Sequence, residues 1–130
     1  MKILIVEDEL VSRKKLEKIL SGYGNCDVTV NGIEGVKAFE AAWEIGAPYD
    51  LICMDIMMPE MDGKEALEKI REIEKEKGMQ GREVKVLMQT SLEDSKNVLD
   101  AFNRGATSYI VKPVDGEKLL KEIRGFGFAV

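Results

Sequence analysis

The chain of 130 residues has the length of one domain and a formal net charge of −5. This acidic balance argues against nucleic acid as a direct partner, because binding to a phosphate backbone requires a basic surface. Hydrophobic residues at 45% and charged residues at 33% are typical of a globular domain rather than a disordered chain. No stretch approaches the ~20 apolar residues that a membrane span needs. The apolar run at 3–6 is also too short for a signal peptide.

The cysteines and histidines restrict the chemistry further. Cys26 and Cys53 have neither the spacing of metal ligands nor a C-x-x-C arrangement, so we expect two reduced thiols in a cytoplasmic protein. The chain contains no histidine. Catalysis by histidine, metal ligation by histidine and a phosphohistidine of the chain's own are therefore excluded.

Short apolar segments alternate with segments of helical periodicity along the whole chain. The expected strands lie at 2–6, 27–31, 51–54, 84–88 and 108–111. Apolar residues at helical spacing predict helices over 11–20, 35–45, 66–77, 98–105 and 119–123. This alternation predicts a parallel sheet with right-handed crossovers and helices on both faces. The remaining tail at 125–130 is too short for a second domain.

Side chains suited to binding a charged ligand follow four of the expected strands. They are Glu7, Asp8, Asp55, Thr90, Ser91 and Lys112. Because the carboxyl ends of neighbouring parallel strands share one edge of a sheet, these side chains share a crevice if their strands are neighbours. Three carboxylates gathered there repel one another unless a cation neutralises them. Oxygen ligands, with positions left for water and phosphoryl oxygens, suit Mg²⁺.

Such a site fits phosphoryl transfer to an oxygen nucleophile. The metal and Lys112 would hold the oxygens of the transferred group, and Thr90 could donate a hydrogen bond to one of them. Attack by the Asp55 carboxylate would give an acyl phosphate. Taken alone, Asp55 is better explained as a turn or helix-capping aspartate. The other strand ends favour the functional interpretation.

These residues match a known family. The chain resembles the receiver domain of bacterial two-component response regulators, of the CheY-like single-domain type, over essentially its whole length. The matching pieces are Ile3-Leu-Ile-Val-Glu-Asp8, Met54-Asp-Ile-Met-Met-Pro59 with Asp62-Gly63, Thr90-Ser91, Gly105-Ala106 and Tyr109-Ile-Val-Lys-Pro113. The resemblance implies a flavodoxin-like α/β fold with strand order 2-1-3-4-5. It also implies a receiver domain over 1–130 without an output domain, and no disulfide, because the first strand separates the two cysteines.

The resemblance assigns a role to each site residue. Asp55 would accept a phosphoryl group from a histidine of a sensor kinase or a histidine phosphotransfer protein. Asp8 and Asp55 would bind Mg²⁺, or alternatively Mn²⁺, with the backbone carbonyl of Met57 as a further ligand and Glu7 acting mostly through water. Lys112 would pair with Asp55 and then with the phosphoryl group, and a cis peptide would precede the proline that follows it.

The resemblance also implies a conformational switch. Phosphorylation would draw Thr90 toward a phosphoryl oxygen, and the ring of Tyr109 would turn inward into the vacated space; an ordinary strand aromatic would not move. The face of the fourth helix, fifth strand and fifth helix would then control an unidentified partner protein. The chain is expected to be a signalling switch, not an enzyme, that catalyses only its own phosphorylation and dephosphorylation. We expect a monomer or a weak phosphorylation-dependent dimer.

Three other classes of protein share parts of this pattern. Phosphatases of the haloacid dehalogenase type place a general-acid aspartate two residues after the nucleophile, where this chain has Met57. Flavin-binding proteins of similar topology cradle phosphate in a loop after the first strand, where Glu7-Asp8-Glu9 would repel an anion. A pseudo-receiver would signal by binding alone. The complete set of site residues argues against this interpretation.

A few positions depart from the family's commonest pattern. Ser91 stands where a smaller alanine is usual, and the segment 76–83 is longer than usual. Met57 and Leu92 occupy positions whose identity tunes the lifetime of the acyl phosphate in the family.

Overall fold

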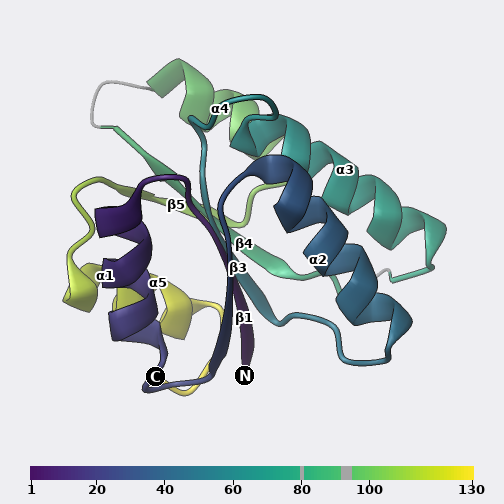
Figure 1. Ribbon diagram of the computed structural model, residues 1–130, viewed down its shortest axis with the longest axis horizontal. Helices are drawn as coiled ribbons and strands as arrows, with labels where there is room; N and C mark the ends of the chain where they lie inside the picture. The colour runs from purple at the N-terminus through teal and green to yellow at the C-terminus, as the bar shows by residue number, and fades with distance from the viewer. Residues whose placement is uncertain (80, 92–94) are drawn as a thin grey trace.

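The computed structural model describes residues 1–79, 81–91 and 95–130, and its strands and helices alternate as the sequence predicts (Figure 1). Leu92, and Gln80 within the segment 76–83, lie outside the described residues. The strands are β1 (Lys2–Val6), β2 (Asn25–Thr29), β3 (Leu51–Asp55), β4 (Lys85–Thr90) and β5 (Ser108–Val111). The helices are α1 (Leu10–Leu20), α2 (Gly32–Glu44), α3 (Gly63–Glu76), α4 (Ser95–Asn103) and α5 (Gly116–Gly125).

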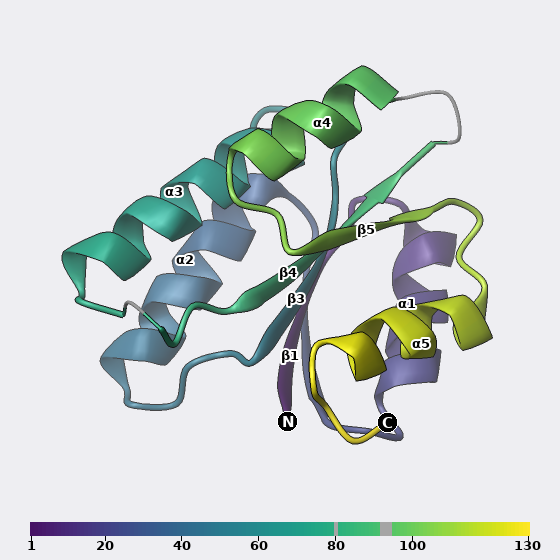
Figure 2. The ribbon, with the colours of Figure 1, turned by 180° about the vertical axis from the view of Figure 1, so that it is seen from behind.

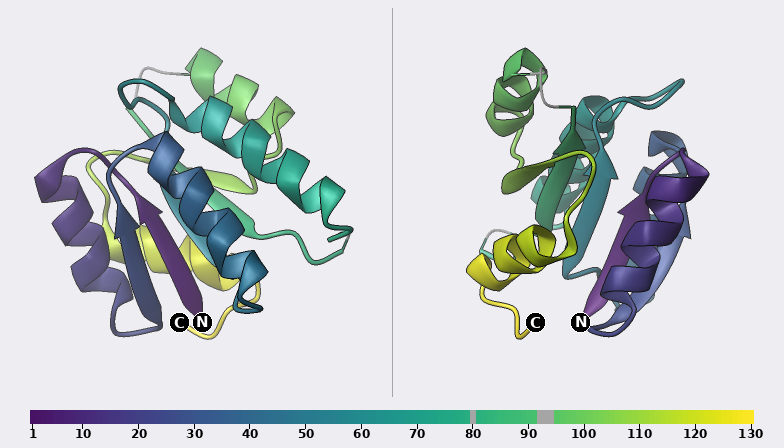
Figure 3. Two further views of the ribbon diagram at one scale, coloured as in Figure 1. Left: turned by 45° about the vertical axis from the view of Figure 1, so that its right-hand side comes forward. Right: turned by 90° about the vertical axis from the view of Figure 1, so that its left-hand side faces the viewer.

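The strands form one parallel sheet in the order β2-β1-β3-β4-β5, which confirms the expected flavodoxin-like fold. All residues of β3 are buried, as expected for a central strand that is covered on both faces. Because the strands are parallel, the carboxyl ends of β1, β3, β4 and β5 lie at one edge of the sheet (Figure 3).

Helices cover both faces of the sheet (Figures 1 and 2). Helices α1 and α5 lie on one face, where Leu16 and Leu119 belong to a buried cluster. Helices α2, α3 and α4 lie on the other, where Phe39, Leu67 and Ala101 belong to a second cluster. Within the described ranges, no helix combines the length and the apolar character that a membrane crossing requires.

The second strand lies two residues earlier than the sequence predicts, at Asn25–Thr29 instead of 27–31. The reason is the helix that follows. The side chain of Asn31 caps α2 by accepting a hydrogen bond from the backbone N–H of Glu34 at 2.8 Å. The helix consequently begins at Gly32 instead of residue 35, and Asn31 serves the helix and not the strand.

The apolar stripe of α4 is only partly buried. Ala101 is buried, whereas Leu99 is 64% exposed and Phe102 is 40% exposed. The ring of Phe102 meets that of Tyr109 on β5 edge to face, with a centroid distance of 5.9 Å and an interplanar angle of 88°. A hollow of about 290 Å³ lies between α4 and β5, beside these rings.

Both cysteines are free thiols in the structure. Cys26 lies on β2 and Cys53 on β3, with β1 between the two strands. Burial raises the pKa of the Cys53 thiol to about 12. Cys53 is therefore an inert core residue rather than a reactive thiol.

Candidate functional site

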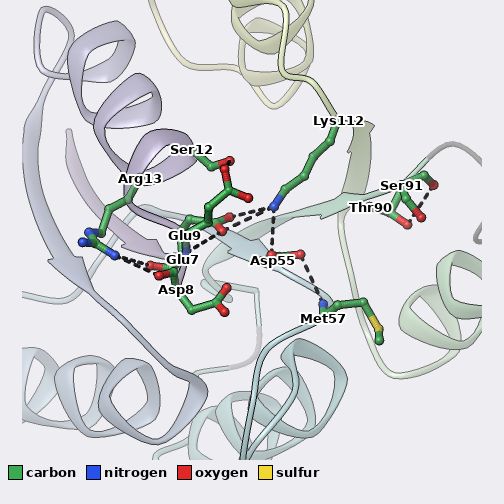
Figure 4. A network of polar contacts seen from close by, with 10 residues as sticks. All are labelled: Glu7, Asp8, Glu9, Ser12, Arg13, Asp55, Met57, Thr90, Ser91 and Lys112. Atoms are coloured by element: carbon green, nitrogen blue, oxygen red, sulfur yellow. Dashed lines mark hydrogen bonds and ion pairs between the residues drawn. The ribbon is translucent and has the colours of Figure 1, made fainter.

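The strand ends bring four charged side chains together (Figure 4). Glu7 and Asp8 follow β1, Asp55 is the last residue of β3, and Lys112 follows β5. The sheet order puts β3 between β1 and β4, so Asp55 occupies the middle of the group. Residues far apart in the sequence thus share one crevice, as the alternation of strands and helices predicts.

Three carboxylates form the acidic part of this crevice. One oxygen from each of Glu7, Asp8 and Asp55 can be chosen so that all lie within 4.8 Å of one another. Glu7 is fully buried, Asp55 is 6% exposed and Asp8 is exposed. The donor set consists of oxygen alone and has one side open to solvent. These properties fit Mg²⁺, which keeps part of its shell for water or phosphoryl oxygens.

Lys112 supplies the cation that faces these carboxylates. Its Nζ donates to Asp55 Oδ2 at 2.9 Å and to Glu7 Oε1 at 3.3 Å, and lies 3.2 Å from Glu7 Oε2. The backbone N–H of Lys112 donates to the carbonyl of Thr90 at 2.8 Å, and the peptide bond to Pro113 is cis, as expected. Burial alone would lower the pKa of Lys112, but the hydrogen bond to Asp55 and the charges of Asp55 and Glu7 outweigh it and raise the pKa.

Glu7 is the carboxylate most perturbed by its surroundings. Burial and, after it, the charge of Asp55 raise its pKa from 4.5 to about 7 against the opposing attraction of Lys112. Its Oε2 has no hydrogen-bond partner among the residues that the structure describes. Because its pKa stays raised despite the ammonium of Lys112, a second cation beside this buried carboxylate would further stabilise its charged form.

The chain leaves Asp55 through a tightly held loop. The backbone N–H of Met57 donates to Asp55 Oδ1 at 3.2 Å, so the two oxygens of Asp55 have different partners, Met57 and Lys112. The N–H of Gly63 returns to the carbonyl of Ile56 at 2.8 Å. A Cβ on Gly63 would overlap the carbonyl oxygen of Asp55. Glycine therefore allows α3 to begin directly against the site.

Thr90 and Tyr109 lie beside the charged group but not in it. Thr90 is 2% exposed, and its hydroxyl donates to the carbonyl of Ser91 at 3.3 Å. Tyr109 is 42% exposed and packs on Phe102. Neither side chain is hydrogen-bonded to Asp55 in the described ranges. Their proposed movements remain predictions.

Arg13 also contributes to the site, although no motif in its sequence context marks it. Its Nη1 donates to the carbonyl oxygens of Glu7 at 3.1 Å and of Asp8 at 3.3 Å. These bonds tie the backbone of the acidic turn to α1 (Figure 4). A basic residue one turn into the helix after an acidic strand end is the signal that would have identified it.

Comparison with known proteins identifies the family. A family model described as the response regulator receiver domain matches residues 3–124. The chain belongs to this family. The chemotaxis protein CheY of Treponema pallidum is 38% identical over 94% of this chain and 79% of its own length.

Two solved structures of the family share the fold closely. One is the CheX–CheY–BeF₃–Mg²⁺ complex of Borrelia burgdorferi, with a TM-score of 0.83 and 29% identity over 99% of this chain and 90% of that one. The other is the complex of the histidine phosphotransfer protein Ypd1 with the receiver domain of Ssk1 from Saccharomyces cerevisiae. It has a TM-score of 0.83 and 29% identity over 98% of this chain and 88% of that one.

Membership of this family makes the chain a CheY-like receiver domain of phosphorelay signalling. The pocket of Glu7, Asp8 and Asp55 fits the phosphoacceptor site of such domains, and an acidic triad of this kind is typical of their Mg²⁺ site. The interpretations as a haloacid dehalogenase or a flavin-binding protein are thereby set aside.

Proposed function

We propose that Asp55 accepts a phosphoryl group from a histidine of a sensor kinase or a histidine phosphotransfer protein. The bond between phosphorus and the histidine nitrogen breaks, a bond between phosphorus and an Asp55 carboxylate oxygen forms, and the nitrogen leaves with the electron pair. The observation that carries the proposal is the group of Glu7, Asp8 and Asp55 around one point, with Lys112 2.9 Å from Asp55. The ammonium would follow the charge from the carboxylate to the phosphoryl oxygens.

Glu7, Asp8 and Asp55 would hold Mg²⁺ or Mn²⁺, with the backbone carbonyl of Met57 as a further ligand and Glu7 acting mostly through water. Bound there, the metal would offset the negative charge of the carboxylates and of the phosphoryl oxygens. Two observations support this assignment: the donor set consists of oxygen atoms, and Oε2 of Glu7 accepts no hydrogen bond from the described residues.

Thr90 and Tyr109 would convert phosphorylation into a change of surface. The Thr90 hydroxyl would leave the carbonyl of Ser91 for a phosphoryl oxygen, and the Tyr109 ring would leave Phe102 and turn inward. The weak 3.3 Å hydrogen bond of Thr90 and the hollow of about 290 Å³ beside both residues support this movement. The face of α4, β5 and α5 would then change its affinity for a downstream protein.

We further propose that residues 1–130 form a receiver domain that acts in the cytoplasm as a monomer or a weak phosphorylation-dependent dimer. It would be a switch rather than an enzyme, catalysing only its own phosphorylation and dephosphorylation. One relative has been solved in complex with a phosphotransfer protein and another in complex with CheX. These structures support the proposal that this chain also binds protein partners. The net charge of −5 disfavours nucleic acid as the target.

Chemical phosphorylation tests the acceptor. Incubation with Mg²⁺ and acetyl phosphate should add one phosphoryl group, measured by intact-protein mass spectrometry, and Asp55→Asn should add none. Asp62→Asn is the matched control, because Asp62 caps α3 by accepting from Glu65 N–H at 2.9 Å, a role that asparagine fills equally. Labelling of Asp55→Asn at the parent rate would show that the nucleophile lies elsewhere.

The same experiment separates a pseudo-receiver from a true one. A pseudo-receiver would take no label in the presence of Mg²⁺ and would bind its partner equally well with and without acetyl phosphate. The complete set of charged residues around Asp55 favours the labelled outcome.

A further inference from the structure

Gln89 on β4 is a buried polar residue to which neither the fold nor the proposed function gives a role. It is fully buried, and neither its Oε1 nor its Nε2 has a hydrogen-bond partner among the described residues. A buried amide in this condition is costly, because it has given up its hydrogen bonds to water and gained none in return. Among the described residues, the only other buried side-chain nitrogen or oxygen without a hydrogen bond is Oε2 of Glu7, which lies 3.2 Å from Lys112 Nζ in an ion pair.

Gln89 and Glu7 both lie next to Asp55 in the sheet. Gln89 pairs in register with Asp55 on the neighbouring strand β3. On the other side, Val6 pairs with Met54, so Glu7 continues the same row beyond β1. Glu7, Asp55 and Gln89 thus form one row across three strands, with the proposed phosphoryl acceptor in the middle.

The three side chains also point to the same face. Along β4, Leu87 belongs to the cluster beneath α1 and α5 and Met88 to the cluster beneath the other helices. Because side chains alternate along a strand, Gln89 points toward α1 and α5 like Leu87. Cys53 pairs with Leu87 and shares its cluster, so Asp55 points the same way.

The side chain of Lys112 extends along this row from the β5 end of the sheet toward Asp55. Its backbone N–H is bonded to Thr90 at the end of β4, yet its Nζ reaches Asp55 on β3. Neighbouring strands lie about 4.8 Å apart, so the lysine stem passes over the end of β4 on the face to which Gln89 points. An ammonium has three donors. In the part of the chain that the structure describes, its acceptors are the carboxylates of Asp55 and Glu7 alone.

We propose that Gln89 is a positioning residue for Lys112, whose ammonium donates a hydrogen bond to the Gln89 amide oxygen in the phosphorylated protein. The inference rests on the proposed function of Asp55. When Glu7 contributes to a metal site and Asp55 carries a phosphoryl group, neither carboxylate is fully available as a hydrogen-bond acceptor for the Lys112 ammonium. The Gln89 oxygen is the unoccupied acceptor in the same row. A charged donor makes a stronger bond to it than a neutral one, and this bond keeps the ammonium against the phosphoryl oxygens.

The variant Gln89→Met removes the amide and keeps the length of the side chain. We expect labelling by acetyl phosphate and Mg²⁺ to be about tenfold slower, the size of effect for one hydrogen bond to a charged group. The urea midpoint should stay unchanged or rise, because an unpartnered buried amide has been removed. Leu87→Met is the matched control on the same strand and face, and should label like the parent.

Two readouts distinguish positioning from a structural role. In a Lys112→Met background, Gln89→Met should cause no further slowing, because both changes remove the same interaction. The ¹⁵N resonance of the Lys112 ammonium in the protein with Mg²⁺ and beryllofluoride should shift in Gln89→Met and not in Leu87→Met.

The outcomes separate this inference from the proposed function. The positioning role is refuted if the parent labels at Asp55 and Gln89→Met labels equally fast. It is also refuted if Gln89→Met slows labelling by the same factor in the parent and in Lys112→Met. In either case the assignment of Asp55 as the acceptor is unaffected. If the parent takes no label, the proposed function and this inference both fail.

Discussion

The buried carboxylate of Glu7 gives the metal-free protein a measurable electrostatic cost. Burial first, and the charge of Asp55 second, raise its pKa from 4.5 to about 7, a value that already includes the attraction of Lys112. A carboxyl group whose pKa is higher in the folded state binds its proton more tightly there. The tighter proton binding of Glu7 in the folded state therefore adds its full contribution to the free energy of unfolding below pH 4.5. This contribution is lost as the pH rises through about 7. At ~1.36 kcal/mol per pKa unit, the full loss is at most about 3 kcal/mol.

Glu7→Gln tests this reasoning, because glutamine resembles the protonated glutamate in shape and charge. In EDTA, the variant and the parent should be about equally stable near pH 4.5, and the variant should become more stable by up to about 3 kcal/mol near pH 8. Urea unfolding followed by circular dichroism at a series of pH values measures the difference. Mg²⁺ at the higher pH should stabilise the parent more than the variant. A stability difference that stays constant across the series would refute the assigned cause.

Three further predictions follow from the geometry. Gly63→Ala should lower the free energy of unfolding by about 2 kcal/mol or more, because its Cβ overlaps the backbone at the end of β3, whereas Gly22→Ala, with nothing near its Cβ, should have little effect; urea unfolding compares them. An alkylating reagent at neutral pH should modify Cys26 slowly and Cys53 only after unfolding, as peptide mass spectrometry would detect, and equal reaction of both native thiols would contradict the burial of Cys53. Lys112→Ala should fold normally but show smaller amide NMR shifts in α4, β5 and α5 on addition of Mg²⁺ and beryllofluoride; shifts as large as the parent's would remove Lys112 from the switch.

The fold was predictable because its central strands are nearly continuous apolar runs. Leu51 to Met54 can only be a strand buried on both faces or a helix segment, and the turn residues on either side favour the strand. The error at β2 arose because Asn31 continues an extended pattern in sequence but caps a helix in space. The open stripe of α4 was also unpredictable, since helical spacing shows which residues share a face but not whether that face is covered.

The acidic part of the site could be found from the ends of the strands, because each side chain follows a recognisable apolar run. Arg13 and Gln89 could not be found in this way. The contribution of Arg13 depends on where α1 starts relative to the acidic turn. That of Gln89 depends on register, because only the pairing of β3 with β4 puts its amide beside Asp55.

Borohydride trapping of the phosphorylated protein tests the role of Asp55 most directly. Borohydride reduces an acyl phosphate to an alcohol and thereby converts the modified aspartate to homoserine, which peptide mass spectrometry locates. We predict homoserine at position 55, and only after incubation with both Mg²⁺ and acetyl phosphate. Homoserine at Asp8 or at another carboxylate, or its formation without Mg²⁺, would contradict the account.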